Sequence, residues 1–366
     1  MIGGWYEGDV QLREHVPLAP LTSLGVGGPA RYFLEVGTVE HLIEALAWAR
    51  DRDLPVHVLG GGSNVVVHDD GVRALVVRIA LRGSAFREHA GCVEVTIGAG
   101  EPWDDFVAST VTAGWAGLEC LSGIPGRVGA SPIQNVGAYG REIGDLVSAV
   151  KVLDRTTLET RRLDAQDCAF AYRDSAFKRE LRDRYVVLEV TYRLVPGGAP
   201  TLHYAELQRH FATQGRSAPS PAEVRAAVLA VRRAKSMLED PTDPNGRSCG
   251  SFFVNPIVSP DALATIEARA STEVPRYELP GGRAKVPAAW LIERAGFPKG
   301  ISDGPVGLST RHTLAIVAHA GARAEDVVRF AWRVRSGVEE RFGVTLVPEP
   351  EMWGFDHLEG RLPVID

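Results

Sequence analysis

Two reactive side chains lie two residues apart in NGRSCGSFFVNP, the stretch that covers residues 245–256. Cys249 can act as a nucleophile once it ionises to the thiolate. Ser251 carries a hydroxyl, and both side chains can in principle do acid, base or nucleophile chemistry. The glycines around both residues favour a turn. Residue types alone leave open which of the two acts, and on what.

Two other stretches are rich in glycine. LGGGSN (59–64) separates two β-branched runs, and GIPGRVGASPIQNVGAYG (123–140) carries polar side chains between its glycines. Glycine lets a backbone approach a ligand closely, and successive N–H groups can cradle a phosphate. A Rossmann fingerprint is excluded because Asn64 leads into a strand-like run instead of a helix. A hairpin turn and a structural Ω-loop remain alternatives, but two such loops in one α+β unit fit a dinucleotide-like ligand with a pyrophosphate.

The periodicity of apolar residues predicts the elements that carry these stretches. Leu42, Ile43, Leu46 and Ala47 have helical spacing, whereas β-branched runs broken by Gly and Asp are typical of strands. A capping box is expected at the start of the helix that begins after Ser220. The stretch at 239–248 has the composition of a boundary between domains. The predicted helices cover 38–53, 102–114, 220–237, 259–270, 287–296 and 324–342, and the predicted strands cover 55–79 in three pieces, 92–100, 148–154, 185–195, 313–319 and 344–355.

Composition limits the classes of function. The 366 residues suggest two or three domains, and the net charge of −6 argues against a large nucleic-acid interface. The N-terminal stretch lacks a signal-peptide pattern and no apolar run is long enough to span a bilayer, so we expect a cytoplasmic protein without membrane insertion. We expect reduced thiols, with neither a disulfide framework nor a zinc site, because the cysteines lack CxxC spacing. The cysteines are Cys92, Cys120, Cys168 and Cys249.

Longer motifs occur in a fixed order along nearly the whole chain. They are LTSLGVGGPARYF (21–33), LGGGSN (59–64), GLECLSGIPGRVGASPIQNVGAYGREI (117–143), YRDSAFK (172–178), GSFFVNP (250–256), KVPAAWLIERAGF (285–297), RHTLAIV (311–317) and PEPE (348–351). In this order they resemble the UDP-N-acetylenolpyruvoylglucosamine reductase (MurB) family, the flavoenzymes of peptidoglycan precursor synthesis. APTLHYAELQRHF (199–211) resembles the tyrosine-bearing loop of the type I subfamily.

The resemblance implies an α+β fold. A two-part FAD-binding unit of the vanillyl-alcohol-oxidase (PCMH) type would be joined to a C-terminal α+β substrate-binding domain. The expected boundaries are 17–68 for the first FAD-binding subdomain, completed by a C-terminal strand at 344–360, then 69–238 for the second, and 240–343 for the substrate domain. The last boundary agrees with the composition of 239–248. We expect a monomer.

The resemblance also implies a reaction. NADPH would reduce FAD, and a hydride from flavin N5 would convert UDP-N-acetylglucosamine enolpyruvate to UDP-N-acetylmuramate. The carbon beside the carboxylate must then receive a proton, and the developing enolate must be stabilised. Ser251 matches the family's proton donor, and Arg173 and Glu351 match its enolate stabilisers. A glutamate with this task should be protonated, which predicts a desolvated site and a raised pKa.

The remaining implied contacts fall into two sets. Those to FAD belong to the two glycine-rich stretches: Gly60, Gly61, Gly62, Ser63, Asn64, Gly123, Ile124, Pro125, Gly126, Gly129, Ala130, Ser131, Asn135, Gly137, Ala138 and Tyr139. Those to the substrate match positions spread along the chain: Gln134, Tyr204, Lys235, Asn255, Lys285 and His312. For Lys285 and His312, a structural or solvated role is an equal alternative.

Two other functions fit parts of the pattern. An alcohol oxidase on the same FAD-binding architecture often holds FAD through a histidine in the first glycine loop, which LGGGSN lacks. A flavin- or nucleotide-sugar-binding protein without catalysis is disfavoured by the presence of all three implied catalytic residues. In the implied reaction Cys249 becomes a replaceable neighbour of Ser251, at which thiol reagents would block the cleft.

The chain also departs from the family pattern at a few positions. Val254 stands where lysine is common and Ala289 where glycine is expected, while Pro348 and Met352 flank the final acidic residues. These departures concern packing and the charge of the substrate pocket more than the implied catalytic residues. The family's substrate affinity therefore carries over to this chain less directly than its catalytic residues do.

Overall fold

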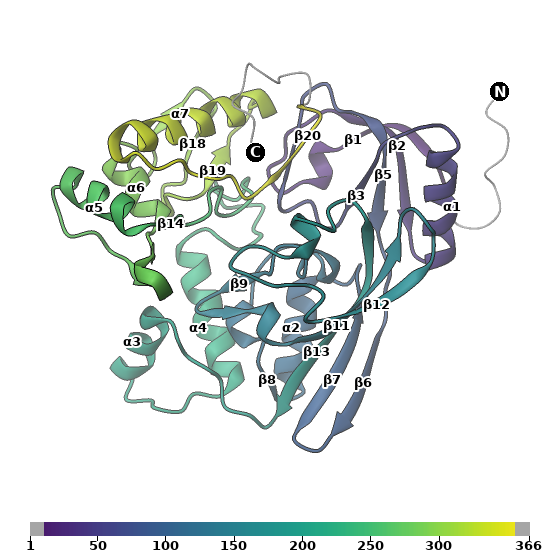
Figure 1. Ribbon diagram of the computed structural model, residues 1–366, viewed down its shortest axis with the longest axis horizontal. Helices are drawn as coiled ribbons and strands as arrows, with labels where there is room; N and C mark the ends of the chain where they lie inside the picture. The colour runs from purple at the N-terminus through teal and green to yellow at the C-terminus, as the bar shows by residue number, and fades with distance from the viewer. Residues whose placement is uncertain (1–10, 356–366) are drawn as a thin grey trace. The chain divides into compact units, whose positions relative to one another are not determined.

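The computed structural model describes residues 11–355 (Figure 1). These residues form two compact units. Unit 1 comprises residues 11–16, 31–61 and 73–233, and unit 2 comprises 17–30, 62–72 and 234–355. The glycine-rich stretch at 59–64 is one of the points at which the chain passes from one unit to the other. Residues 356–360 of the expected C-terminal strand and the first ten residues lie outside the described range. The division into three domains stays a prediction.

Unit 1 is built mainly on two sheets. Its strands are β1 (Arg13–Pro17), β2 (Pro29–Val36), β3 (Val56–Leu59), β5 (Val72–Ile79), β6 (Ser84–His89), β7 (Cys92–Gly98), β8 (Trp115–Ala116), β9 (Gly137–Ala138), β10 (Arg141–Glu142), β11 (Val147–Asp154), β12 (Thr160–Asp164) and β13 (Tyr185–Pro196). The first sheet has the order β1-β2-β5-β3, with β3 parallel to β5. The second is antiparallel, with the order β12-β11-β13-β7-β6 and β8 paired to β13. β9 and β10 form a separate pair.

Four helices complete unit 1: α1 (Val39–Arg50), α2 (Trp103–Thr112), α3 (Ala205–Thr213) and α4 (Pro221–Ala234). The apolar faces of α1 and α2 are buried in one core together with residues of both sheets, such as Val77 and Tyr192. α3 and α4 share a smaller apolar cluster, against which Tyr139 and Tyr204 pack. The predicted capping box is confirmed, because Glu223 N donates to Ser220 Oγ at 3.3 Å and Ser220 N donates to Glu223 Oε2 at 2.8 Å.

Unit 2 contains short strands and three helices. The strands are β4 (Val65–Val67), β14 (Ile257–Val258), β15 (Tyr277–Glu278), β16 (Ala284–Lys285), β17 (Ser302–Asp303), β18 (Val306–Leu308), β19 (Ile316–Ala318) and β20 (Glu351–Trp353), and the helices are α5 (Pro260–Arg269), α6 (Ala288–Arg294) and α7 (Ala324–Phe342). β4 and β20 pair in parallel, and β14-β16-β15 and β17-β18-β19 form small antiparallel sheets. Asp69 fixes the start of α7, because its carboxylate accepts from the N–H groups of Ala324 at 2.9 Å and Glu325 at 3.0 Å.

The predicted helices are all present, but two predicted strands are shorter than expected. The prediction of a strand over 344–355 is wrong before Glu351, since Pro348 and Pro350 have no N–H to donate to a ladder. The strand expected at 313–319 begins at Ile316, after a turn that Ala315 N closes on the carbonyl of His312 at 3.1 Å. The sequence also missed α3 and the strands β1, β2, β6, β8 to β10, β12 and β14 to β18. All of β6 is exposed and lacks the alternation that marks a half-buried strand.

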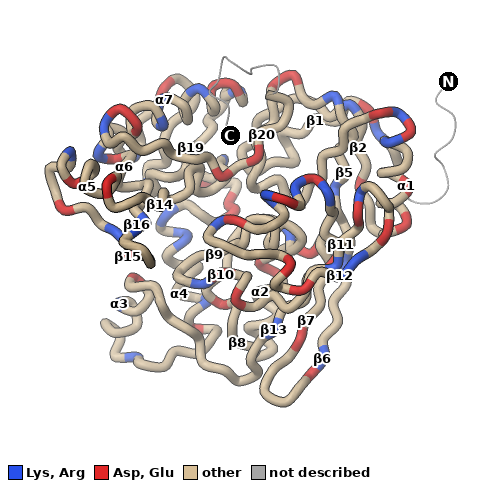
Figure 2. Tube along the Cα trace, in the orientation of Figure 1, with Lys and Arg blue, Asp and Glu red and all other residues tan. Residues whose placement is uncertain are grey.

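Charged residues of both signs are interspersed along each unit (Figure 2). Many form surface ion pairs, such as Arg193 with Glu94 at 3.0 Å and Arg333 with Asp303 at 3.0 Å. Exposed pairs of this kind contribute at most about 1 kcal/mol each to folding. Among the helices of residues 11–355, none has the length and apolar content needed to cross a membrane.

Candidate cofactor and substrate site

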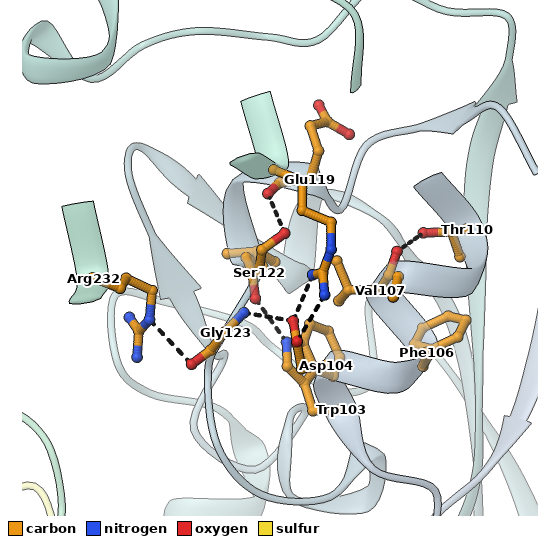
Figure 3. Close-up of polar contacts among 12 residues, drawn as sticks. Trp103, Asp104, Phe106, Val107, Thr110, Glu119, Ser122, Gly123 and Arg232 are labelled. Carbon is orange, nitrogen blue, oxygen red and sulfur yellow. Dashed lines mark hydrogen bonds and ion pairs between the residues drawn. The ribbon is translucent and has the colours of Figure 1, made fainter. Parts of the chain in front are cut away.

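Side chains from two helices fix the second glycine-rich stretch at Gly123 (Figure 3). The Gly123 N–H donates to Asp104 Oδ1 of α2 at 2.5 Å, and its carbonyl accepts from Arg232 Nε of α4 at 3.1 Å. Just before this turn, Trp103 Nε1 donates to the carbonyl of Leu121 at 2.9 Å. Gly123 itself has a φ of 71°, which favours glycine. The peptide groups before and after Gly123 are therefore each fixed by a side chain.

Asp104, which accepts from the Gly123 N–H, is strongly paired with arginine. Burial alone would raise the pKa of the Asp104 carboxyl, but hydrogen bonds from Arg225 and Gly123 and the charges of Arg225 and Arg232 hold that pKa below its usual value. Arg225 binds both carboxylate oxygens, with Nη1–Oδ1 and Nη2–Oδ2 distances of 2.6 and 2.8 Å. Asp104 is consequently ionised, and it anchors α4 to the glycine turn.

The two glycine-rich stretches meet where neither has a side chain. A Cβ placed on Gly61 would lie 2.6 Å from Gly126 Cα, so the two backbones touch directly. A Cβ on Gly129 would lie 2.6 Å from Ala99 Cβ, which leaves no room for a larger residue. The first stretch is not a hairpin, because β3 pairs with β5 and β4 pairs with β20. Main-chain amides in glycine loops are the donors that a pyrophosphate requires, so the residues present fit FAD.

The side chain of Asn135 is used by the protein itself. Its Nδ2 donates to Glu142 Oε2 and to the carbonyl of Ala171, both at 2.7 Å, and its Oδ1 accepts from Gly144 N at 2.9 Å. The residue is buried and has a φ of 44°. These bonds engage both N–H donors and the carbonyl oxygen of the amide, so the Asn135 side chain stabilises the loop. A contact between Asn135 and FAD would therefore involve its main chain.

Ser131 and Tyr139 are also tied to neighbouring side chains. Ser131 Oγ lies 2.6 Å from the hydroxyl of the fully buried Tyr192 and donates to a carbonyl of its own turn. The ring of Tyr139 meets the ring of Tyr204 edge-on, with the centroids 5.4 Å apart. Burial raises the pKa of Tyr139 to about 12, although the Arg232 charge acts in the opposite direction. An expected cofactor contact and an expected substrate contact are thus packed together in unit 1.

Arg173 is held against the same stretch by its side chain. Its Nη2 donates to the carbonyl of Gly137 at 2.5 Å, and a Cβ on Gly137 would lie only 2.9 Å from Arg173 Nη1. Arg173 has a φ of 54°, a strained conformation for a residue with a side chain. Asn135, Tyr139 and Arg173 all share this left-handed conformation. Such strain gathers at functional sites, and three of the predicted site residues carry it.

Ser251 is positioned by main-chain hydrogen bonds on both sides. It forms an antiparallel bridge with Ala315, and the next residue, Phe252, donates its N–H to the carbonyl of Leu314 at 2.8 Å. The carbonyl of Phe252 accepts from Glu349 N, also at 2.8 Å. The segment that carries Ser251 is therefore tied directly to the chain that leads into Glu351.

Glu351 opens β20, and the first glycine-rich stretch fixes its backbone. Its N–H donates to the carbonyl of Asn64 at 3.1 Å, while Asn64 Nδ2 donates to the carbonyl of Glu349 at 3.1 Å. The Glu351 side chain is exposed. The prediction that this glutamate is desolvated concerns the site with substrate bound, and it stays a prediction.

Loop contacts in unit 2 support the expected substrate residues. Ser236, which follows Lys235, has a φ of 55° and accepts from Asn245 Nδ2 at 3.5 Å. Asn245 Oδ1 in turn accepts from Thr310 N at 2.9 Å, close in sequence to His312. Asn255 Oδ1 accepts from the first N–H of α6, that of Ala288, at 2.8 Å. Lys285 Nζ lies 5.3 Å from the centre of the Tyr277 ring, within the range of a cation–π contact.

Burial decides the role of Cys249. It raises the pKa of the thiol to about 12, and the nearby charge of Glu349 acts in the same direction. The reactive form of a cysteine is the thiolate, so burial and the raised pKa argue against the expectation that thiol reagents attack here. Cys92, Cys120 and Cys168 are also free, as predicted.

Each unit contains part of the predicted set. Unit 1 carries Arg173, Gln134, Tyr204, Gly60, Gly61 and the contacts at 123–139. Unit 2 carries Gly62, Ser63, Asn64, Lys235, Ser251, Asn255, Lys285, His312 and Glu351. Among the remaining expected cofactor contacts, Ile124, Pro125 and Ala138 are partly buried and Ala130 is exposed.

Sequence reasoning missed Asp104, Arg225 and Arg232. One signal was present: Arg232 follows Val228 by four residues, so it occupies the apolar face of the predicted helix at 220–237. A cation at such a position needs a buried partner. The sequence does not indicate which residue that partner is.

Comparison with known proteins first defines the class. Residues 30–161 match the family model described as an FAD binding domain, and residues 240–353 match that of the UDP-N-acetylenolpyruvoylglucosamine reductase C-terminal domain. The chain is an FAD-dependent oxidoreductase of the predicted α+β class, with an FAD-binding unit followed by a C-terminal domain.

Whole-chain relatives define the family. The chain is 49% identical to a UDP-N-acetylenolpyruvoylglucosamine reductase of Thermobifida fusca over 93% of its own length and 98% of the relative's. It is 44% identical to the protein of that name from Cutibacterium acnes, over 93% and 90% of the two chains. The crystal structure of MurB from Thermus caldophilus superposes with a TM-score of 0.63 at 27% identity, covering 94% and 99% of the two chains. The chain belongs to the UDP-N-acetylenolpyruvoylglucosamine reductase family.

Proposed function

We propose that the protein uses NADPH to reduce the enolpyruvyl ether of UDP-N-acetylglucosamine enolpyruvate, giving UDP-N-acetylmuramate for peptidoglycan synthesis. The relatives named above carry the name of this reductase. The observation that carries the proposal is the fixed position of Ser251, whose segment is hydrogen-bonded through Phe252 to the chain that bears Glu351. A proton donor and an enolate stabiliser are the groups that the reaction needs besides the cofactor.

The division of labour follows from the chemistry of each side chain. Bound FAD supplies the hydride. Ser251 delivers a proton to the carbon beside the carboxylate, and a neighbouring group or water returns a proton to its hydroxyl. Arg173 supplies a permanent positive charge for the carboxylate on which negative charge develops. Its strained backbone and its bond to Gly137 fix that charge in place before substrate arrives.

Glu351 is proposed to donate a hydrogen bond to the same developing enolate. Its exposed side chain then has to lose solvent when the substrate binds, because a carboxyl group remains protonated near neutral pH only in a desolvated setting. Lys235, Tyr204, Gln134 and Asn255 are proposed substrate contacts, with Lys235 and Tyr204 suited to the diphosphate. Lys285 and His312 are proposed as additional contacts near it.

One experiment tests the function. The purified protein should carry FAD, and NADPH should bleach the flavin without oxygen. UDP-N-acetylglucosamine enolpyruvate should then restore the flavin colour under the same anaerobic conditions, with UDP-N-acetylmuramate as the product. Flavin that stays bleached with this compound but is reoxidised by oxygen would indicate an oxidase and contradict the proposal.

A further inference from the structure

Two arginines of α4 act on the backbone of Gly123, in the second glycine-rich stretch. Arg232 donates directly to the carbonyl of Gly123 at 3.1 Å. Arg225 binds Asp104 through two hydrogen bonds of 2.6 and 2.8 Å, and Asp104 accepts from the N–H of the same glycine at 2.5 Å. The two arginines are seven residues apart, which places them on one face of the helix. The N–H and the carbonyl of Gly123, which belong to the two peptide groups that flank this residue, are therefore both held by α4, the carbonyl directly and the N–H through Asp104.

This arrangement places charged groups in partly or fully buried positions. Arg232 is 7% exposed and Asp104 is half-buried, so two cations and one carboxylate are partly or fully removed from water. Buried ionic groups are often no more stabilising than apolar residues of similar volume. Removal of one of these charged partners is costly. The presence of Asp104, Arg225 and Arg232 together is better explained by the backbone of Gly123, which they hold in position. Their excess of one positive charge lies beside a loop that is expected to contact a pyrophosphate.

The neighbours of Arg232 extend the same set. Tyr139, another expected FAD contact, acts on the Arg232 guanidinium through a hydrogen bond. Burial lowers the pKa of Arg232, while Tyr139 and Asp104 act in the opposite direction. A guanidinium stays protonated in proteins, so the positive charge is permanent. The glycine at the start of the loop and the tyrosine near its end are thus connected through one cation.

We propose that Arg225 and Arg232 are positioning residues for FAD: with Asp104 they fix the backbone of Gly123, and their net positive charge strengthens binding of the FAD pyrophosphate. The proposal rests on FAD binding, which the family establishes, and on the expected contact at 123–126. It does not depend on which sugar nucleotide is reduced. Its test therefore measures FAD binding, which needs no substrate.

The experiment compares Arg225→Gln and Arg232→Gln with a matched control, Arg233→Gln. Arg233 lies on the same helix but is exposed. FAD is removed from each protein, and the Kd for FAD is measured by fluorescence titration of the refolded apoprotein at low and high salt. We expect Kd to rise at least tenfold for Arg225→Gln and Arg232→Gln and less than twofold for the control. The Kd of both variants should also depend less on salt than that of the unmodified protein, since each has lost a cation that attracts the anion.

Two results would overturn the proposal. One is a Kd within twofold of the unmodified protein for both variants. The other is weaker binding with an unchanged salt dependence, which would indicate a purely structural role. If Arg232→Gln does not fold, Arg225→Gln and Arg225→Lys decide between these results. Lysine keeps the charge but loses the two-bond geometry, so Arg225→Lys should keep the salt dependence and recover part of the affinity.

Discussion

The second glycine-rich stretch and the Ser251 segment hold their functional residues in opposite ways. Between Gly123 and Tyr139, side chains brace the loop: Asn135, for example, forms three hydrogen bonds within the protein. Around Ser251 and Glu351, the backbone makes the fixing bonds instead. The first region has side chains that maintain a shape for the cofactor. The second relies mainly on main-chain bonds, with one side-chain bond from Asn64 Nδ2 to the carbonyl of Glu349. Substitutions in the first should therefore affect folding and FAD retention, and those in the second should affect chemistry.

The largest effect is expected from Ser251→Ala. Loss of a positioned proton donor typically costs about 10²–10⁴-fold in rate. Flavin reoxidation by the enolpyruvyl substrate should slow by this factor, while bleaching by NADPH should be unchanged because that step needs no proton on carbon. Stopped-flow absorbance of the two half-reactions separates them. Main-chain bonds hold the residue, so the free energy of unfolding should change by less than about 0.5 kcal/mol.

An equal slowing of both half-reactions would contradict this assignment. It would mean that Ser251 maintains the shape of the segment, as side chains do in the second glycine-rich stretch. The comparison between the two regions would then fail at its central residue.

Asn135→Ala is the corresponding change in the braced loop. It removes three hydrogen bonds, leaves the Gly144 N–H and the Ala171 carbonyl without this partner, and places alanine at a φ of 44°. We expect a loss of about 2–4 kcal/mol in the free energy of unfolding, measured by urea denaturation. Gln134→Ala, at the partly buried neighbouring position, is the control and should cost less than about 1 kcal/mol. Equal losses for the two variants would show that Asn135 does not brace the loop.

Much of the fold could be predicted from local pattern. α1, α4 and α7 have clear apolar spacing. The residue types at Ser220 and Glu223 are enough to predict the capping box. The strand β6 could not be predicted, because all of its residues are exposed and only its pairing with β7 makes it a strand. α3 was missed as well, within a stretch interpreted as a loop.

The site was predicted through motif order, and its supports were not. The glycines of 123–137 indicate close backbone approach by type alone. Asp104 and Arg232 are separated from Gly123 by many residues, so their roles appear only once α2 and α4 are folded. The same holds for the exposure of Glu351, which depends on the position of β20 at the end of a pairing with β4. Contacts between residues far apart in the chain determine these features, and a single sequence does not show which residues make such contacts.

A smaller effect should appear in the dependence of stability on pH. The pKa of Asp104 is lowered in the folded protein, so its pairing stabilises the fold above the unfolded value of about 3.9 and is lost as pH falls through the folded value. Unfolding by urea at a series of pH values from neutral to 2.5 should therefore show a decline below about pH 4. Asp104→Asn should remove part of that decline. An unaltered pH profile in the variant would show that the Arg225–Asp104 pair does not contribute to it.

The smallest effect on catalysis is expected for Cys249→Ser, two residues before Ser251. The thiol is buried and its pKa is raised to about 12, so at neutral pH it is protonated and has no place in the proposed proton transfer. Both half-reactions should keep their rates, and placing a hydroxyl in this apolar position should cost about 1–3 kcal/mol of stability. In the unmodified protein, labelling of Cys249 by iodoacetamide, followed by mass spectrometry, should be slow in buffer and fast in urea. If Cys249→Ser slowed flavin reoxidation as much as Ser251→Ala does, the proton transfer could not be assigned to Ser251. Equal effects would mean that both substitutions act by disturbing the structure of the segment that carries them.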